Sequence, residues 1–108
     1  VWRLPLLPDG TLSRMGVFIQ MSGGRGPDGM AIDEDDGLVV AHPDMGAVWV
    51  FNHRGEPLYR VDSPGSDVVT NCAFGVKDPH MLYIVDSEGG AILSAELPTP
   101  GRKMYGLS

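Results

Sequence analysis

The sequence predicts an all-β protein, a partial β-propeller with about two to two and a half four-stranded antiparallel blades. Three observations support this fold class. The apolar segments are short and rich in β-branched and aromatic residues. Glycine and proline account for 15 and 9 of the 108 residues, which favours many turns over long helices. The apolar segments also repeat at the length of a propeller blade.

Nine segments have the length and composition of β-strands, and no segment has a convincing helical pattern. They are residues 1–6, 16–21, 29–33, 37–42, 47–52, 57–63, 71–75, 81–87 and 91–97. Turn-forming sequences separate them, and residues 35–37 (DDG) and 54–56 (RGE) lie where tight hairpin turns are expected.

The strand segments repeat with a period near 45 residues. GAVWVF at 46–51 recurs as GAILSA at 90–95, and LVVA at 38–41 recurs as LYIV at 82–85, both with an offset of 44. VWRL at 1–4 resembles VWVF at 48–51. Four short strands in each such period are typical of a propeller blade.

This period divides one partial propeller domain, residues 1–108, into four parts. They are the end of one blade (1–21), a complete blade (28–63), most of a third (70–97) and a C-terminal tail (98–108). A blade buries both faces against its neighbours, so these parts cannot close a ring. The start on a strand-like VWRL without Met leads us to expect a fragment or a processed product. A nine-stranded β-sandwich is the alternative fold.

Composition excludes two classes of partner. The net charge is −6 and the eight Lys and Arg residues are scattered, so we expect no nucleic-acid partner. No segment approaches the roughly 18 apolar residues of a membrane span, and no signal peptide is visible. We therefore expect a cytoplasmic protein without a membrane partner. The single cysteine, Cys72, lies in an apolar run and is expected to be a buried structural thiol.

Three motifs resemble those of the senescence-marker/regucalcin/gluconolactonase family. GPDGMAID at 26–33, followed by GLVVA at 37–41, resembles its Pro-Asp-Gly strand motif. VTNCAFG at 69–75 resembles the opening of the family's next blade, and AELPTPG at 95–101 resembles its C-terminal ending. The order and blade spacing of the motifs make the resemblance fairly specific, and it spans nearly the whole chain.

The resemblance implies a propeller of about six blades that holds one divalent cation, calcium or zinc, near its axis. Family members hydrolyse lactones of sugar acids and some related esters. Their metal ligands are a Glu from the first blade, an Asn from a middle blade and the Asp of the Pro-Asp-Gly motif. Only the last maps onto this sequence, at Asp28. We therefore expect the isolated chain to have little lactonase activity.

Asp28 is the predicted metal ligand and catalytic residue. A residue at the start of an innermost strand points into the funnel at one end of a propeller, where oxygen ligands from several blades can share a cation. A cation there would polarise a lactone carbonyl, and the carboxylate could also act as a general base. The alternative is that Pro27-Asp28-Gly29 forms an ordinary turn.

Two further residues are predicted to bind substrate. Asn71 occupies the equivalent strand start one blade later, although an Asn there is also a common turn cap. His42, the second of these residues, ends the second strand of the Asp28 blade and could line the funnel. Asp86 follows the corresponding strand of the next blade in the same way. We predict that Asp28, Asn71 and the loop 26–29 lie at one end of the strands and face a common cavity.

One motif is excluded as a metal site, and one alternative function remains open from the sequence. The acidic run 33–37 fails the spacing of a calcium loop, because its fifth position is Gly37, and is expected to be a solvated hairpin turn. The chain could also be a non-catalytic folding or assembly module instead of part of a lactonase. In either case its incomplete blades predict a homo-oligomer, a dimer or a trimer, or contact with missing N-terminal blades.

Overall fold

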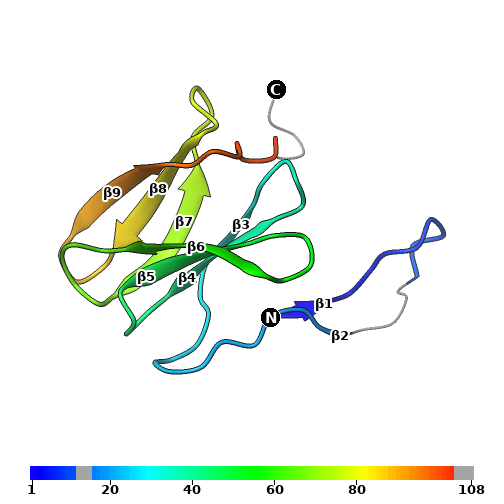
Figure 1. The fold of residues 1–108 in the computed structure, drawn as a ribbon, viewed down its shortest axis with the longest axis horizontal. Coiled ribbons are helices and arrows are strands. Elements are labelled where there is room, and N and C mark those ends of the chain that lie inside the picture. Colours follow the sequence, from blue (N-terminus) through cyan, green and yellow to red (C-terminus); the bar gives the residue numbers. More distant parts are fainter. Residues whose placement is uncertain (12–15, 104–108) are drawn as a thin grey trace.

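The structure is a computed structural model that describes residues 1–11 and 16–103. These residues form nine strands in three antiparallel sheets, in which each strand pairs with its neighbour in sequence (Figure 1). The first sheet contains β1 (Trp2–Arg3) and β2 (Gly16–Val17). The second blade contains β3 (Met30–Ile32), β4 (Leu38–His42), β5 (Ala47–Phe51) and β6 (Pro57–Asp62). The third blade contains β7 (Val69–Phe74), β8 (Met81–Asp86) and β9 (Ala91–Glu96).

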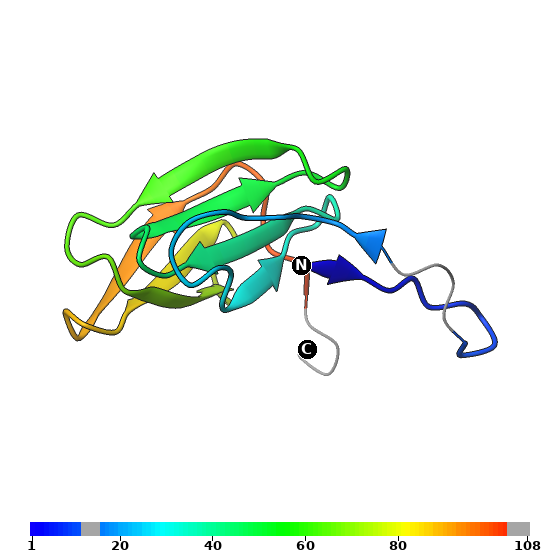
Figure 2. The same ribbon diagram turned by 90° about the horizontal axis from the view of Figure 1, so that it is seen from below.

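This arrangement confirms the predicted all-β partial propeller. Each of the nine predicted segments overlaps a strand, and the described residues contain no helix. The first two strands are much shorter than predicted. They pair only with each other among the described residues, and residues 4–11, which follow β1, extend away from the two larger sheets in both views (Figures 1 and 2). No helix in the described part of the chain is long and apolar enough to cross a membrane.

The second blade is buried on both faces at its centre. Val39, Val40 and Ala41 of β4 are all fully excluded from solvent. Val39 and Ala41 pack toward the third blade, whereas Val40 packs with Ile19 on the opposite face. Successive strand residues point to opposite faces, so an uninterrupted apolar run is the pattern of a sheet covered on both sides.

The third blade is covered on one face only. In β8, Leu82 and Ile84 are buried against the second blade, while Tyr83 and Val85 between them are exposed. On the neighbouring β9, Ile92 pairs with Val85 and is 73% exposed. The strict alternation of buried and exposed residues along β8 marks a sheet whose outer face has no covering layer among the described residues.

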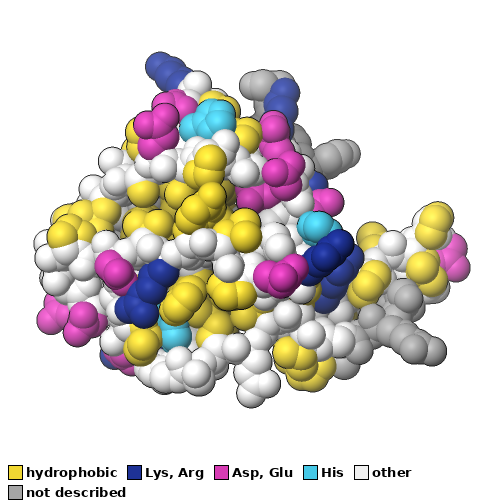
Figure 3. Space-filling model, in the orientation of Figure 1, with side chains coloured by type: hydrophobic (Ala, Val, Ile, Leu, Met, Phe, Trp, Pro, Cys, Tyr) yellow, Lys and Arg dark blue, Asp and Glu magenta, His cyan; other side chains and the backbone are white. Residues whose placement is uncertain are grey.

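The core lies between the second and third blades. Figure 3 shows hydrophobic side chains gathered near the middle of one face of the molecule. The buried members of the inter-blade core are Val39, Ala41, Val48, Val50, Val69, Cys72, Leu82, Ile84 and Leu97. This shared core makes the two blades one structural unit.

The segment after β9 ties the two blades together at one end. Figure 1 shows it crossing from β9 to the tip of the β3–β4 hairpin. The Gly101 N–H donates to the Pro79 carbonyl at 2.8 Å, and the Arg102 N–H donates to the Ile32 carbonyl at 2.9 Å. Backbone bonds from consecutive residues to different blades fix this end of the interface.

The acidic run 33–37 forms the expected turn between β3 and β4, but Asp33 itself is buried. Its Oδ1 accepts hydrogen bonds from the backbone N–H groups of Asp35 at 2.9 Å and Gly37 at 2.7 Å. The carboxylate therefore closes the turn by bonding to backbone donors, as Asp side chains commonly do.

Loss of a side chain from the inter-blade core should destabilise the whole chain. Leu82 is fully buried in β8, so Leu82→Ala is expected to lower the free energy of unfolding by about 2–5 kcal/mol. Ile92→Ala is the matched control, because Ile92 is exposed on the adjacent strand, and its effect should stay within about 0.5 kcal/mol. Urea denaturation measures both variants. Equal losses would contradict this assignment of the covered face.

Candidate functional site

The innermost strands of the second and third blades begin side by side. The Asp28 N–H donates to the Ala41 carbonyl at 2.9 Å, and the Ala41 N–H donates to the Gly29 carbonyl at 2.9 Å. The Gly29 N–H donates across the interface to the Thr70 carbonyl at 3.0 Å. These bonds place Asp28 and the start of β7 at the same end of the two sheets.

Asp28 is exposed on the loop that leads into β3. No hydrogen bond or ion pair to its carboxylate is present within residues 1–11 and 16–103. Its backbone, in contrast, is fixed to β4 through Ala41. A fixed backbone with an accessible carboxylate is suited to binding a ligand.

Asn71 lies directly against the residue that follows Asp28. A methyl group placed on Gly29 would lie 2.6 Å from Asn71 Cγ and 2.8 Å from Asn71 Cα, both far inside van der Waals contact. Asn71 Oδ1 accepts a hydrogen bond from the Cys72 N–H at 2.9 Å. Since a backbone N–H donates, the acceptor must be the amide oxygen, which leaves the Nδ2 amino group as the end that Asn71 can offer to a ligand.

His42 lies at this end of the sheets but is buried, with 2% of its surface exposed. Its Nε2 lies 2.9 Å from the Gly23 carbonyl oxygen, and its Nδ1 lies 3.3 Å from the indole nitrogen of Trp49. Trp49 can only donate, so Nδ1 accepts and Nε2 carries the proton that is donated to Gly23. Both ring nitrogens thus bind protein atoms and hold the Gly23 loop against β4.

Asp86 occupies the same strand position in the third blade and is also buried. The Ser66 hydroxyl donates to Asp86 Oδ1, as does the Gly89 N–H at 2.8 Å. These bonds, with the Ser66 hydroxyl contributing most, hold the pKa of Asp86 below its usual range. Asp86 therefore fixes the loop between the two blades to the β8–β9 turn, and its carboxylate is already occupied by protein donors.

One polar pair at this end was not singled out from the sequence. The hydroxyls of Thr70 and Ser87 lie 2.6 Å apart, next to the backbone bond between Thr70 and Gly29. No spacing pattern connects these residues. They meet because β7 begins where β8 ends, a feature of strand pairing that sequence separation does not reveal.

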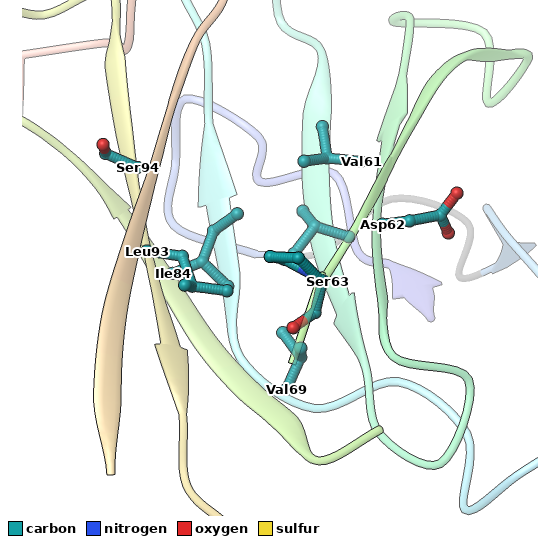
Figure 4. Close-up of a pocket in the computed structure, with 9 residues that line it drawn as sticks. Val61, Asp62, Ser63, Val69, Ile84, Leu93 and Ser94 are labelled. Atoms are coloured by element: carbon teal, nitrogen blue, oxygen red, sulfur yellow. The ribbon is translucent and has the colours of Figure 1, made fainter. Parts of the chain in front are cut away.

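The common cavity expected beside Asp28 and Asn71 stays a prediction, because the two cavities described by the structure lie elsewhere. A cavity of about 140 Å³ lies instead between β6 and β9, lined chiefly by apolar side chains (Figure 4). Val61 lies on one side of it and Ile84 and Leu93 on the other, while the Asp62 carboxylate points away. Neither Asp28 nor Asn71 lines this cavity.

The described residues contain no group of three or more His, Cys, Asp or Glu side chains that could hold a metal ion. Asp28 belongs to no such group, and the oxygen of the neighbouring Asn71 amide is already bonded. A hard cation such as calcium takes about six to eight oxygen ligands. These residues by themselves do not fit a complete cation site.

Comparison with known proteins assigns the chain to a family. The sequence pattern described as the SMP-30/Gluconolactonase/LRE-like region matches residues 1–88. The chain belongs to this family. The match covers most of the chain, including both Asp28 and Asn71, and it confirms the resemblance that the three sequence motifs indicate.

Relatives of this gluconolactonase-like chain are considerably longer. Lactonase drp35 of Staphylococcus haemolyticus is 43% identical over 118 aligned positions, which cover 95% of this chain and 36% of that protein. Lactonase drp35 of Staphylococcus aureus is 34% identical over 105 positions, covering 94% and 31%. An X-ray structure provisionally assigned as a gluconolactonase matches with a TM-score of 0.78 and 25% identity, covering 95% and 33%. The chain spans about a third of the length of these proteins.

Cys72 of this gluconolactonase-like chain is a structural residue in the inter-blade core, as the sequence predicts. It is 5% exposed, and burial raises the pKa of its thiol to about 11. A thiol with this pKa is protonated at neutral pH and is a poor nucleophile.

The Asp86 interactions predict a specific loss of stability in acid. A carboxyl whose pKa is lower in the folded state stabilises the fold above its unfolded pKa of about 3.9, and this contribution is lost as the pH falls through the folded pKa. Asp86→Asn keeps an oxygen acceptor but does not ionise. The free energy of unfolding of the wild type should therefore fall more steeply than that of the variant between about pH 5 and pH 3.

Urea denaturation at a series of pH values measures this difference. Asp35→Asn, which removes an exposed carboxylate from the β3–β4 turn, controls for the loss of one negative charge. If the free energy of unfolding depends on pH in the same way for the wild type and Asp86→Asn, the bonds from Ser66 and Gly89 do not favour the ionised carboxylate over the protonated one.

Proposed function

We propose that this chain contributes the reactive carboxylate to a site that hydrolyses a lactone or a related ester. One observation carries the proposal: the accessible Asp28 carboxylate lies at the start of β3, next to the Asn71 amide of the neighbouring blade. Family membership supports it, since two relatives named as lactonases match nearly the full length of this chain.

Asp28 is the proposed general base. In lactone hydrolysis a water oxygen adds to the carbonyl carbon, and Asp28 accepts the proton that this water loses. When the ring C–O bond breaks, the proton passes to the ring oxygen, and the product is the open hydroxy acid. The negative charge that develops on the carbonyl oxygen needs a hydrogen-bond donor, and Asn71 Nδ2 is the proposed donor.

Asp28 is also the proposed ligand of a divalent cation, calcium or zinc. The described residues contain no group of three or more His, Cys, Asp or Glu side chains around a possible ion, so ligands from another part of the protein would complete the site. His42 remains a proposed substrate residue in a restricted sense. Because both its ring nitrogens bind protein atoms, it would contact a substrate only after the Gly23 loop moves.

A chimeric protein tests the role of Asp28. Residues 1–108 would replace the matching third of lactonase drp35 of S. haemolyticus, which supplies the rest of the protein. In this chimera, Asp28→Asn is expected to lower kcat/KM for a sugar-acid lactone by about 100-fold or more, because the variant cannot accept a proton. Steady-state hydrolysis rates measure the effect.

Asp35→Asn in the same chimera is the matched control, because Asp35 is an exposed carboxylate at the opposite end of β3. It should leave kcat/KM unchanged. The isolated chain, assayed with millimolar calcium or zinc, should show little turnover, because it lacks the other ligands. An active chimera in which Asp28→Asn is silent would refute the catalytic assignment.

The second candidate function is a non-catalytic folding or assembly module. The exposed apolar face of the third blade supports it, with Tyr83, Val85 and Ile92 uncovered. β9 also pairs with β8 alone in the described residues, whereas the third strand of the second blade, β5, has a partner on each side. An apolar face and an open strand edge both favour association with another β-sheet.

Self-association of the isolated chain is the measurable consequence. Light scattering at micromolar concentration should give a mass corresponding to a dimer or a trimer instead of the 11.6 kDa of one chain. Ile92→Lys, which places a charge on the open face of β9, should shift the population toward the monomer. A wild-type chain that is monomeric and unfolds cooperatively would contradict this expectation.

A further inference from the structure

Gly29 is held by both blades at once. Its carbonyl accepts the Ala41 N–H of β4, and its own N–H donates to the Thr70 carbonyl of β7. The Asn71 side chain fills the space where a Cβ at position 29 would lie. The residue immediately after Asp28 therefore has no freedom to move without displacing β4 or β7.

Asn71 is fixed independently of this contact. Its Oδ1 accepts the Cys72 N–H at 2.9 Å, and the Cys72 side chain is buried in the core that both blades share. The Cys72 sulfur in turn lies 3.9 Å from the Gly29 carbonyl oxygen. The Oδ1 atom of Asn71 thus accepts the bond from the β7 backbone and is also the atom of Asn71 nearest the Cβ position of Gly29.

We propose that Asn71 of the third blade is a positioning residue for Asp28 of the second blade. Its amide oxygen bonds to the β7 backbone, and its side chain packs against Gly29. This packing fixes the direction in which the Asp28 side chain leaves the backbone. The assignment deepens the proposed function, on which it rests for the catalytic meaning of Asp28.

The two ends of the Asn71 amide then have separate roles. The oxygen maintains the backbone geometry around Gly29, while the amino group stays available for a ligand oxygen. Asn71→Asp separates these roles, because it keeps an oxygen that can accept the Cys72 N–H but loses the donor. Asn71→Ala removes both.

Hydrogen exchange of the isotope-labelled chain tests the proposal without metal or lactone. Asn71→Ala should accelerate exchange of the Gly29 amide by about tenfold relative to the Asp33 amide, which bonds to Gly37 at the opposite end of β3. Asn71→Asp should restore slow exchange. Ser94→Ala, an exposed substitution on β9, is the control and should change neither amide.

A spectroscopic measurement distinguishes positioning from general packing. The three-bond coupling between the amide and α protons of Asp28 reports its backbone φ angle, which sets the direction of the Cα–Cβ bond. The wild type and Asn71→Asp should show the value of one fixed φ, and Asn71→Ala an averaged one. If Asn71→Ala does not fold, Asn71→Ser, which also withdraws the side chain from Gly29, takes its place.

Two results would overturn the proposal. One is an Asp28 coupling that does not differ between the wild type and Asn71→Ala. The other is equal acceleration of the Gly29 and Asp33 amides, which would make Asn71 a general packing residue. Neither measurement depends on catalysis, so an inactive chimera would refute the proposed function while leaving this result intact.

Discussion

Consecutive residues of β4 pack against different parts of the molecule, and both sets are fully buried. Val39 faces the third blade and Val40 faces the segment that carries Ile19. This two-sided burial is what a central propeller blade requires, because hydrophobic burial on each face supplies the stability that a four-stranded sheet lacks by itself. The direction of β3, and with it the placement of Asp28, follows from the position of β4 between these two layers.

The site end of the sheets depends on polar contacts that connect separate loops. His42 and Asp86 occupy the same position at the ends of the second strands of their blades. The buried His42 side chain bonds to the Gly23 carbonyl, and the buried Asp86 carboxylate accepts the Ser66 hydroxyl, so each side chain holds a loop. Buried polar groups need such partners, because an unsatisfied one costs about 1–3 kcal/mol. At this position of the repeat, two different side chains thus have the same structural role, which is to hold a loop against the sheet.

The same reasoning explains why Asp28 differs from the other polar residues nearby. His42, Asp86 and the oxygen of Asn71 all use their hydrogen-bonding groups on protein atoms. Asp28 keeps its backbone bonded to β4 and its carboxylate accessible. A group that binds ligands must be positioned by its neighbours while its ligand-binding atoms stay free of bonds to them.

Much of the fold could be predicted because strand pairing in this chain is local. Within each sheet, every strand pairs with the next along the chain, so the alternation of apolar runs and turns contains most of the information needed. The predicted segments at 1–6 and 16–21 were too long, because a residue belongs to a strand only where it pairs with a residue of an adjacent strand. Two residues of each segment form such pairs here. The start of β7 was missed by two residues because its pairing register shifts between Val69 and Asn71.

The sequence by itself determined the strand order, the blade period, the family and the candidacy of Asp28, because these depend on residue types at regular spacing. Only the tertiary structure decided that Asn71 rests on Gly29, that both nitrogens of His42 are occupied, and that Thr70 meets Ser87. These contacts join residues from different strands or loops. Their geometry is set by how two sheets pack and by where a β-bulge shifts the register, and no local pattern encodes either.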